Sequence, residues 1–130
     1  MNLLLDTQAF LWLDSDQAKL SAPARQACAN PENTLWLSVA SAWEMQIKTA
    51  LGKLRLTRPL GQIIAEQQTA NGLQVLTVNL AHVLALQALP PHHKDPFDRL
   101  LIAQALAEKL VLVTCDPLVA QYPEVMTMWE

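Results

Sequence analysis

DPFDRLLIAQALAEKLVLVTCD, the stretch from Asp95 to Asp116, contains a helix pattern, a strand pattern and several acids in close succession. Its Ala- and Leu-rich part from Phe97 to Leu110 predicts a helix, and the apolar run from Val111 to Thr114 predicts a buried strand. Asp116 follows that strand after one further residue, so its carboxylate is expected at the carboxyl end of the strand. A helix that leads directly into a buried strand is typical of an α/β protein.

The same alternation of strand and helix patterns runs through the rest of the chain. Three further apolar runs predict buried strands, at Leu3 to Leu5, Leu35 to Leu37 and Val75 to Val78. Helix patterns lie between them, at Ser21 to Ala29, Ala40 to Leu51, Leu60 to Ala70 and Ala81 to Leu89. This order predicts a three-layer α/β/α fold, in which helices cover both faces of a mostly parallel central sheet of four to five strands. The fifth would be a short edge strand at Val125 to Met128.

Length and composition are those of one domain. The chain has 130 residues, of which 52% are hydrophobic, so residues 1–130 are expected to form a single domain that buries a helix face in a homodimer. No apolar run approaches the roughly 20 residues that a membrane-spanning helix needs, and the opening Met-Asn-Leu-Leu-Leu-Asp lacks a basic leader. Cys28 and Cys115 show no metal-binding spacing. We therefore expect a cytoplasmic protein with reduced cysteines and no membrane contact.

The charge of the chain is acidic overall and basic in one region. The formal charge of −3 argues against a protein that coats nucleic acid through a broad basic surface. Between Glu44 and Glu66, however, every charged side chain is positive, which indicates either a nucleic-acid contact or a solvated helix face. The candidates for phosphate contacts are Lys48, Lys53, Arg55, Arg58, Lys94 and Arg99.

Four acids are placed where an α/β sheet binds its ligands. Asp6 directly follows the first predicted strand, and Asp116 follows the last one. Glu44 and Asp98 each fall in the opening turns of a predicted helix. Because ligands of open parallel sheets bind at the carboxyl edge of the strands, these acids are the candidate site.

Helix capping is the alternative interpretation of each acid taken singly. The possible caps are Asp6 before a helix through Phe10-Leu11-Trp12, the S-x-x-E capping box of Ser41 and Glu44, Asp95 before Pro96, and Asp116 before Pro117. Capping does not require the acids to gather at one edge of the sheet, whereas metal binding does. Their common placement therefore favours a metal site.

The chemistry of such a site follows from its ligand atoms. Carboxylates a few ångströms apart raise one another's pKa unless a cation neutralises them, so a divalent ion is expected. Oxygen ligands favour Mg²⁺ or Mn²⁺ over zinc, and the adjacent His92 and His93, which have no cysteine partner, rarely suit one ion together. An ion held by these acids would act on a phosphodiester. The tryptophans, Trp12, Trp36, Trp43 and Trp129, lie in apolar elements and are expected to pack in the core.

Three stretches of the chain resemble the PIN-domain family, and more narrowly the VapC-type toxins of bacterial toxin–antitoxin pairs. They are Leu4 to Thr7, Ser38 to Glu44, and the segment His93 to Ala105 followed by Thr114-Cys115-Asp116. The last is the most specific, because DPFDRLLIAQA ending in an acid after a strand is hard to obtain by chance. The resemblance spans almost the whole chain, and all four acids are present.

The resemblance implies a metal-dependent endoribonuclease. Asp6, Glu44, Asp98 and Asp116 would hold Mg²⁺ or Mn²⁺ and activate the attacking water. Thr114 would orient Asp116 by a hydrogen bond, and Asp95 would mainly cap a helix. The implied partners are an RNA substrate and a small antitoxin protein that lies across the active-site groove.

Two other classes of α/β protein fit the sequence less well, and one non-enzymatic alternative stays open. A phosphoacceptor receiver domain normally carries paired acids after its first strand and a lysine after a later one, whereas Thr7 follows Asp6 and no lysine follows the last predicted strand. A nucleotide-binding loop is missing, because Gly52, Gly61 and Gly72 are scattered. The open alternative is a catalytically silent PIN-fold module that only binds proteins.

Overall fold

The computed structural model describes residues 1 to 130 and contains one central sheet. Its strands are β1 (Asn2–Leu5), β2 (Thr34–Ser38), β3 (Gln74–Leu76), β4 (Val111–Val113) and β5 (Thr127–Met128). All neighbouring strands run parallel, in the order β3-β2-β1-β4-β5. The prediction of a mostly parallel sheet of four to five strands is therefore confirmed, including the short edge strand near the C-terminus.

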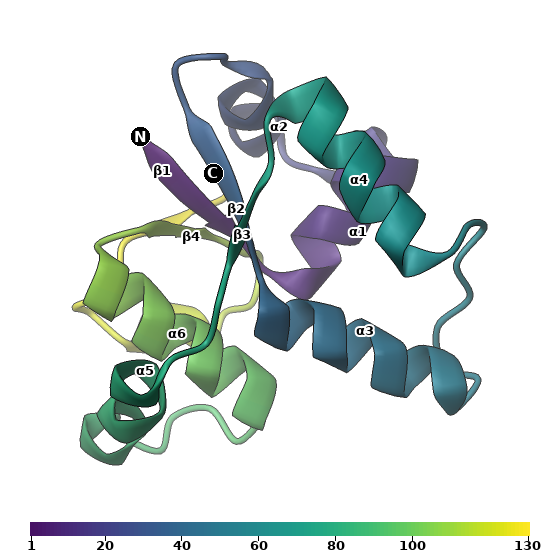
Figure 1. The fold of residues 1–130 in the computed structure, drawn as a ribbon. Helices are drawn as coiled ribbons and strands as arrows, with labels where there is room; N and C mark the ends of the chain where they lie inside the picture. Colours follow the sequence, from purple (N-terminus) through teal and green to yellow (C-terminus); the bar gives the residue numbers. More distant parts are fainter.

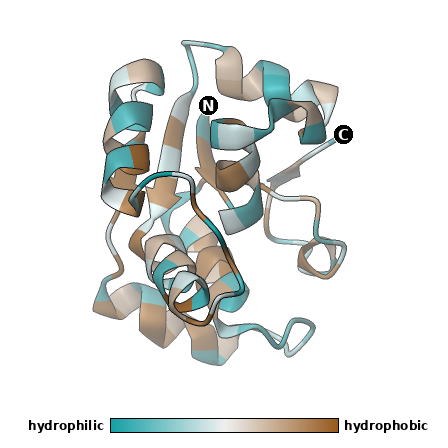
Figure 2. Cartoon of the chain, turned by 90° about the vertical axis from the view of Figure 1, so that its right-hand side faces the viewer, coloured by the Kyte–Doolittle hydropathy of each residue, from teal (hydrophilic) through white to brown (hydrophobic).

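Helices connect the strands and cover both faces of the sheet (Figure 1). They are α1 (Thr7–Ser15), α2 (Ala22–Ala29), α3 (Val39–Ala50), α4 (Leu60–Asn71), α5 (Leu80–Ala85) and α6 (Pro96–Glu108). Short 3-10 turns occur at Gln17–Lys19, Leu86–Ala88 and Val119–Gln121. In Figure 2 the helices alternate between hydrophobic and hydrophilic residues, as expected for helices with one buried face. None of them is both long and apolar enough to span a bilayer.

The buried side chains form two clusters, one on each face of the sheet. Because successive side chains of a strand point to opposite faces, Leu3 and Leu5 of β1 belong to the first cluster and Leu4 belongs to the second. The first cluster includes Phe10 of α1, and the second includes Ile102 of α6. Helices thus pack on both faces of one sheet, which confirms the three-layer α/β/α fold.

The strand register brings the ends of three strands together. In the central strand, Leu5 lies opposite Leu37 of β2 and Val113 of β4. The residues that follow these three positions therefore leave the sheet at one level. Asp6 is the next residue of the central strand, and its main-chain N–H donates to the Val113 carbonyl at 3.1 Å. This fixes Asp6 at the middle of the carboxyl edge.

The N-cap of α3 differs from the capping box that the sequence offered. The sequence suggested a capping box of Ser41 and Glu44, but the helix begins at Val39, directly after β2. Its cap is Ser38, whose hydroxyl accepts a hydrogen bond from the Ala40 N–H at 3.0 Å. The predicted box is wrong because the strand turns into the helix without a loop, which leaves Ser41 buried inside the first turns and frees Glu44 from a capping role.

Strand β3 and helix α5 are both shorter than predicted. Strand β3 ends at Leu76, although the apolar run continues to Val78, and α5 ends at Ala85 before a 3-10 turn. Asn79 accounts for this boundary, since its side chain caps α5 by accepting from the His82 N–H at 3.1 Å.

Shortening Leu4 tests the two-sided packing of the sheet. Leu4 is fully buried, so Leu4→Ala is expected to lower the free energy of unfolding by about 2–4 kcal/mol. The control Leu51→Ala changes a side chain that is 63% exposed and is expected to cost less than about 0.5 kcal/mol. Denaturant unfolding at one protein concentration measures both, and similar effects of the two changes would contradict the described core.

Candidate metal site

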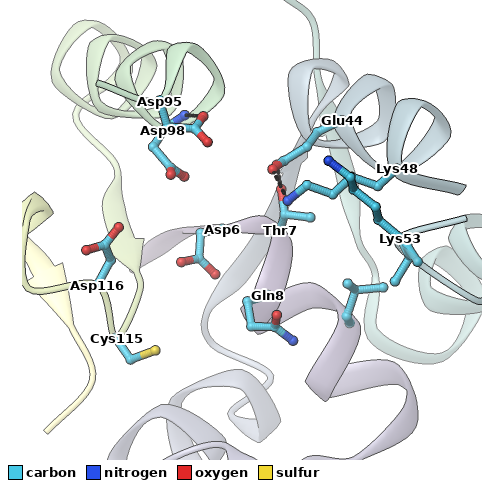
Figure 3. Close-up of a pocket in the computed structure, with 12 residues that line it drawn as sticks. Asp6, Thr7, Gln8, Glu44, Lys48, Lys53, Asp95, Asp98, Cys115 and Asp116 are labelled. Atoms are coloured by element: carbon cyan, nitrogen blue, oxygen red, sulfur yellow. Dashed lines mark hydrogen bonds and ion pairs between the residues drawn. The ribbon is translucent and has the colours of Figure 1, made fainter. Parts of the chain in front are cut away.

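A pocket of about 310 Å³ lies at the carboxyl edge of the sheet and collects all four predicted acids. Asp6, Glu44, Asp98 and Asp116 line it together with Asp95, Lys48, Lys53 and Cys115 (Figure 3). The structure therefore brings the predicted residues together. In the close-up, Asp6 lies between Asp116 on one side and Glu44 on the other.

Asp6 combines the two roles that the sequence left as alternatives. Its Oδ1 accepts a hydrogen bond from the Ala9 N–H at 2.7 Å, so it caps α1. The same carboxylate lines the pocket. Burial raises the pKa of Asp6; the Thr114 hydroxyl and the Ala9 N–H oppose this, and the charges of Asp116 and Glu44 add to it. A neighbouring cation would stabilise the charged form.

Asp98 lies in the first turn of α6, which Asp95 caps. Asp95 Oδ1 accepts from the main-chain N–H groups of Phe97 at 2.8 Å and Asp98 at 3.1 Å, as predicted for a helix cap. Burial raises the pKa of Asp98 to about 7; the nearby charge of Asp95 adds to the rise and His93 opposes it. Near neutral pH Asp98 is therefore only partly ionised, and a cation in the pocket would favour its charged form.

Asp116 is held by donors on both carboxylate oxygens. Its Oδ1 accepts from the Leu118 N–H at 2.9 Å, and its Oδ2 lies 2.7 Å from His93 Nε2. Thr114 does bond to this residue, but through the main chain: its hydroxyl accepts from the Asp116 N–H at 3.1 Å. The predicted orientation of Asp116 by Thr114 therefore acts on the backbone rather than on the carboxylate.

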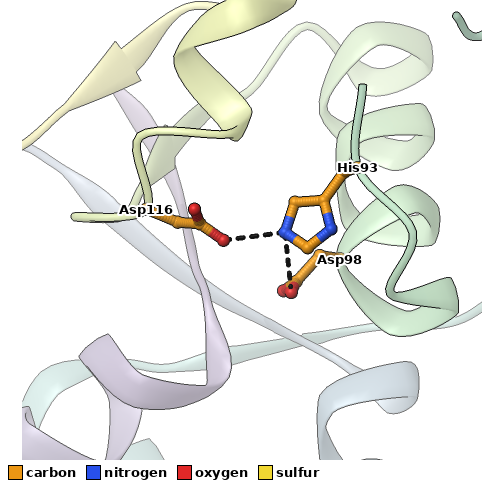
Figure 4. A group of neighbouring side chains, drawn as sticks. All are labelled: His93, Asp98 and Asp116. Atoms are coloured by element: carbon orange, nitrogen blue, oxygen red, sulfur yellow. Dashed lines mark hydrogen bonds and ion pairs between the residues drawn. The ribbon is translucent and has the colours of Figure 1, made fainter. Parts of the chain in front are cut away.

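His93 is the functional candidate that sequence reasoning did not include among the site residues. Its Nε2 lies 2.7 Å from Asp116 Oδ2 and 3.2 Å from Asp98 Oδ2 (Figure 4). The ligand atoms of these three residues lie within 4.8 Å of one another. The signal was the position of His93 two residues before Asp95, but its direction depends on how the preceding loop folds back.

Glu44 has its own partners on the other side of the pocket. Its Oε1 accepts from the Thr7 hydroxyl at 2.5 Å, and its Oε2 lies 2.7 Å from Lys48 Nζ. This contact with Glu44 raises the pKa of Lys48. Glu44 is buried, and these two contacts hold its carboxylate at the pocket wall.

The donor set of the pocket fits a hard divalent cation. Asp6, Asp98 and Asp116 offer carboxylate oxygens, which are the ligands of Mg²⁺ and Mn²⁺. Cys115 also lines the pocket, but burial raises the pKa of its thiol and the charge of Asp6 adds to the rise. A protonated thiol is a poor metal ligand and a poor nucleophile. Neither a zinc site nor cysteine chemistry is supported by these side chains.

The predicted phosphate-binding cations divide into three groups. Lys48 and Lys53 line the pocket. Arg58 instead pairs with Asp14 at 2.9 Å and Glu66 at 2.8 Å, and it joins α1 to α4. Arg99 donates to main-chain carbonyls of the segment before α6, including those of Leu86 and Pro90. The remaining two, Arg55 and Lys94, lie outside the pocket lining.

One tryptophan contradicts the expectation of core packing. Trp43 is 62% exposed and contacts Phe97 edge-on, with ring centroids 5.3 Å apart. Because Glu44 occupies the helix position that faces the pocket, its neighbour Trp43 is turned outward. The other three are partly buried, and Trp12 packs against Trp129 at 5.8 Å.

Comparison with protein families gives one match over nearly the whole chain. A family sequence model described as the PIN domain matches residues 3–125. No curated protein sequence matches the chain.

Solved structures of similar fold cover the chain from end to end. VapBC2 from Rickettsia felis, bound to a DNA fragment from their promoter, matches with a TM-score of 0.69 and 15% identity over 100% of both chains. VapBC-1 from nontypeable Haemophilus influenzae matches with a TM-score of 0.65 and 24% identity over 98% of this chain and 97% of that chain. DNA-bound VapBC from Salmonella typhimurium matches with a TM-score of 0.64 and 15% identity over 98% of this chain and 97% of that chain. At these identities the likeness shows the fold.

The raised pKa of Asp98 predicts a pH-dependent stability of the metal-free protein. The folded state holds this proton up to about pH 7, whereas the ordinary pKa is 3.8, so the free energy of unfolding falls as the pH rises between these values. Asp98→Asn removes this pH-dependent loss of unfolding free energy. In EDTA at pH 8 its melting temperature is expected to exceed that of the wild type by about 3–8 °C, with little difference at pH 4.

Thermal unfolding followed by circular dichroism measures this effect. The matched control is Glu32→Gln, which removes an exposed acid that lies outside the pocket lining. The control is expected to melt like the wild type at both pH values. A melting temperature of Asp98→Asn equal to that of the wild type at pH 8 would show that Asp98 carries no buried charge.

Proposed function

The chain belongs to the PIN-domain family, and from this we propose that it is a metal-dependent endoribonuclease of the VapC type, the toxin of a toxin–antitoxin pair. One observation carries the proposal: the carboxylates of Asp6, Asp98 and Asp116 converge in one pocket that also contains two lysines. Acids held at raised pKa by burial, beside lysine side chains, form a site for a metal ion and a phosphate rather than a scaffold for protein contacts alone.

Each acid has a proposed role in holding Mg²⁺ or Mn²⁺. Asp6, Asp98 and Asp116 provide the oxygens from one side, and Glu44 completes the set from the opposite wall. When bound, the ion supplies positive charge that polarises the scissile phosphodiester and acidifies a water molecule. Thr7 and Lys48 keep the Glu44 carboxylate in place.

Lys48 and Lys53 are proposed to position the RNA backbone. Both line the pocket, and phosphate contacts by cations fix the register of a nucleic acid without reading its sequence. The ion pair with Glu44 holds the Lys48 ammonium group at the pocket wall, and its other N–H groups remain for a phosphate. The choice of RNA as the substrate rests on the resemblance to VapC-type proteins.

A small antitoxin protein is proposed as a second partner. The solved neighbours include VapBC proteins from three bacteria. Beside the metal site, a second pocket shares Gln8, Leu11 and Leu54 with it and is also lined by Trp12 and Leu56. An apolar segment of a partner would bury these side chains and block access to the acids.

A second copy of the chain is proposed to cover α5. Leu80, Val83 and Leu84 of this helix are 71%, 46% and 62% exposed, and together we call them the α5 apolar face. Single exposed apolar residues are common on protein surfaces, but three neighbouring ones on one short helix form a patch of the kind that marks an interaction site. A symmetric pair of such faces would bury both.

Cleavage of a structured RNA pool tests the nuclease proposal. Purified wild type is expected to cut RNA with Mg²⁺ or Mn²⁺ and not with excess EDTA. Asp98→Asn should lose about 100-fold or more of the rate because one carboxylate ligand is gone, whereas Glu32→Gln should keep it. If wild type that is folded and free of antitoxin cuts no RNA under any of these conditions, the nuclease proposal is wrong and the protein-binding module is the better interpretation.

The oligomeric state tests the α5 apolar face. A charge in a buried apolar contact is costly, so Leu84→Glu is expected to convert a dimer into a monomer in light scattering after gel filtration. Leu51→Glu places the same charge at another exposed leucine and should leave the dimer intact. A dimer that persists in Leu84→Glu would place the interface on another surface.

A further inference from the structure

A single buried imidazole lies between two carboxylates that come from different parts of the fold. His93 precedes α6 and is 7% exposed, and its Nε2 is 2.7 Å from Asp116 Oδ2 and 3.2 Å from Asp98 Oδ2 (Figure 4). We propose that His93 is a positioning residue: as a hydrogen-bond donor, and not as a ligand, it holds Asp98 and Asp116 together for the metal ion. Its part in metal binding rests on the function proposed above.

The hydrogen bond at the other ring nitrogen decides between donor and ligand. His93 Nδ1 accepts from the Asp95 N–H at 3.1 Å. In the neutral ring one nitrogen accepts and the other carries the proton, so the proton is on Nε2, which donates to Asp116 Oδ2 and lies 3.2 Å from Asp98 Oδ2. A metal on Nε2 would require the proton on Nδ1, where it would face the Asp95 N–H, a second donor. The same Asp95 that caps α6 thus fixes the His93 tautomer.

The ring is held in place by the fold and not by the acids alone. The main-chain N–H of His93 donates to the Tyr122 hydroxyl at 3.0 Å, and that hydroxyl donates to the Pro90 carbonyl at 2.6 Å. Arg99 Nη1 donates to the carbonyls of Pro90 at 3.0 Å and His93 at 3.3 Å. Tyr122 is almost fully buried. The loop before α6 is therefore anchored on both sides of His93.

The consequence is a carboxylate pair that is assembled before a metal arrives. Asp98 belongs to α6 and Asp116 follows β4, so no local backbone constraint sets the distance between their side chains. His93 Nε2 links them, since it bonds to Asp116 and lies in close contact with Asp98, while each carboxylate keeps further lone pairs for an ion. Partners of this kind, which orient ligands without touching the metal, typically contribute about 10–100-fold to metal affinity.

The tautomer is tested on metal-free wild type, without any assay of catalysis. Long-range proton–nitrogen correlation spectra of ¹⁵N-labelled protein at pH 8 report which nitrogen of His93 carries the proton. The proposal expects a protonated Nε2 and an unprotonated Nδ1. A proton on Nδ1 would overturn it, because Nε2 would then be free to act as a ligand.

Two substitutions separate a donor from a ligand. His93→Gln keeps an N–H donor near the position of Nε2, and His93→Leu removes it. Mn²⁺ affinity, measured by calorimetry and by electron paramagnetic resonance of the free ion, is expected to fall about 10–100-fold in His93→Leu and less than about tenfold in His93→Gln. The control is His92→Leu, an exposed neighbour that packs edge-on against Tyr122 and should bind Mn²⁺ like the wild type.

The outcomes distinguish this inference from the proposed function. Equal Mn²⁺ affinity in His93→Leu and wild type would overturn positioning, as would an equal loss in His93→Gln and His93→Leu. In RNA cleavage at saturating Mn²⁺, the kcat of His93→Gln should return to that of the wild type, and its KM for RNA should equal that of the wild type. If wild type binds Mn²⁺ but cuts no RNA, the nuclease proposal fails and the Mn²⁺ affinities still judge His93. Should His93→Leu not fold, the tautomer and His93→Gln decide.

Discussion

The parallel pairing of β1 with both β2 and β4 is the constraint on which the site depends. It places Asp6 at the middle of the carboxyl edge, bonded through its N–H to Val113. The turns that leave β2 and β4 at the same level then bring α3 and Asp116 to that edge. Because the central strand is buried on both faces, this register cannot slip without exposing the core.

The pocket holds more negative charge than the surrounding structure neutralises. Burial raises the pKa of Asp6 and brings the pKa of Asp98 to about 7. Some compensation is built in: Asp6 and Asp95 accept hydrogen bonds from helix N–H groups, Lys48 pairs with Glu44, and His93 lies against Asp116. For Asp6, a helix cap and a pocket acid are thus not alternatives, because the N-terminal end of α1 stabilises its charge.

The arginines and the lysines that were candidates for phosphate contacts lie in different places. Arg58 and Arg99 have planar guanidinium groups with several donors, and both hold the fold: Arg58 bridges α1 and α4, and Arg99 ties down the segment before α6. Lys48 and Lys53, which are compact point charges, line the pocket instead. The pocket therefore gathers lysine charges, while Arg99 fixes the loop that carries His93.

The sequence by itself determined the layers, the strand order along the chain and the edge at which Asp6, Glu44, Asp98 and Asp116 gather, because hydrophobic periodicity and parallel topology are properties of the chain alone. It offered the wrong N-cap for α3 and the wrong environment for Trp43, since periodicity alone did not say where the strand turns into the helix or which helix face meets the sheet. Only the tertiary structure decided that Arg99 holds carbonyls and that His93 lies between Asp98 and Asp116. Those contacts join residues far apart in sequence, and they exist only after α6, the loop before it and β4 have packed together.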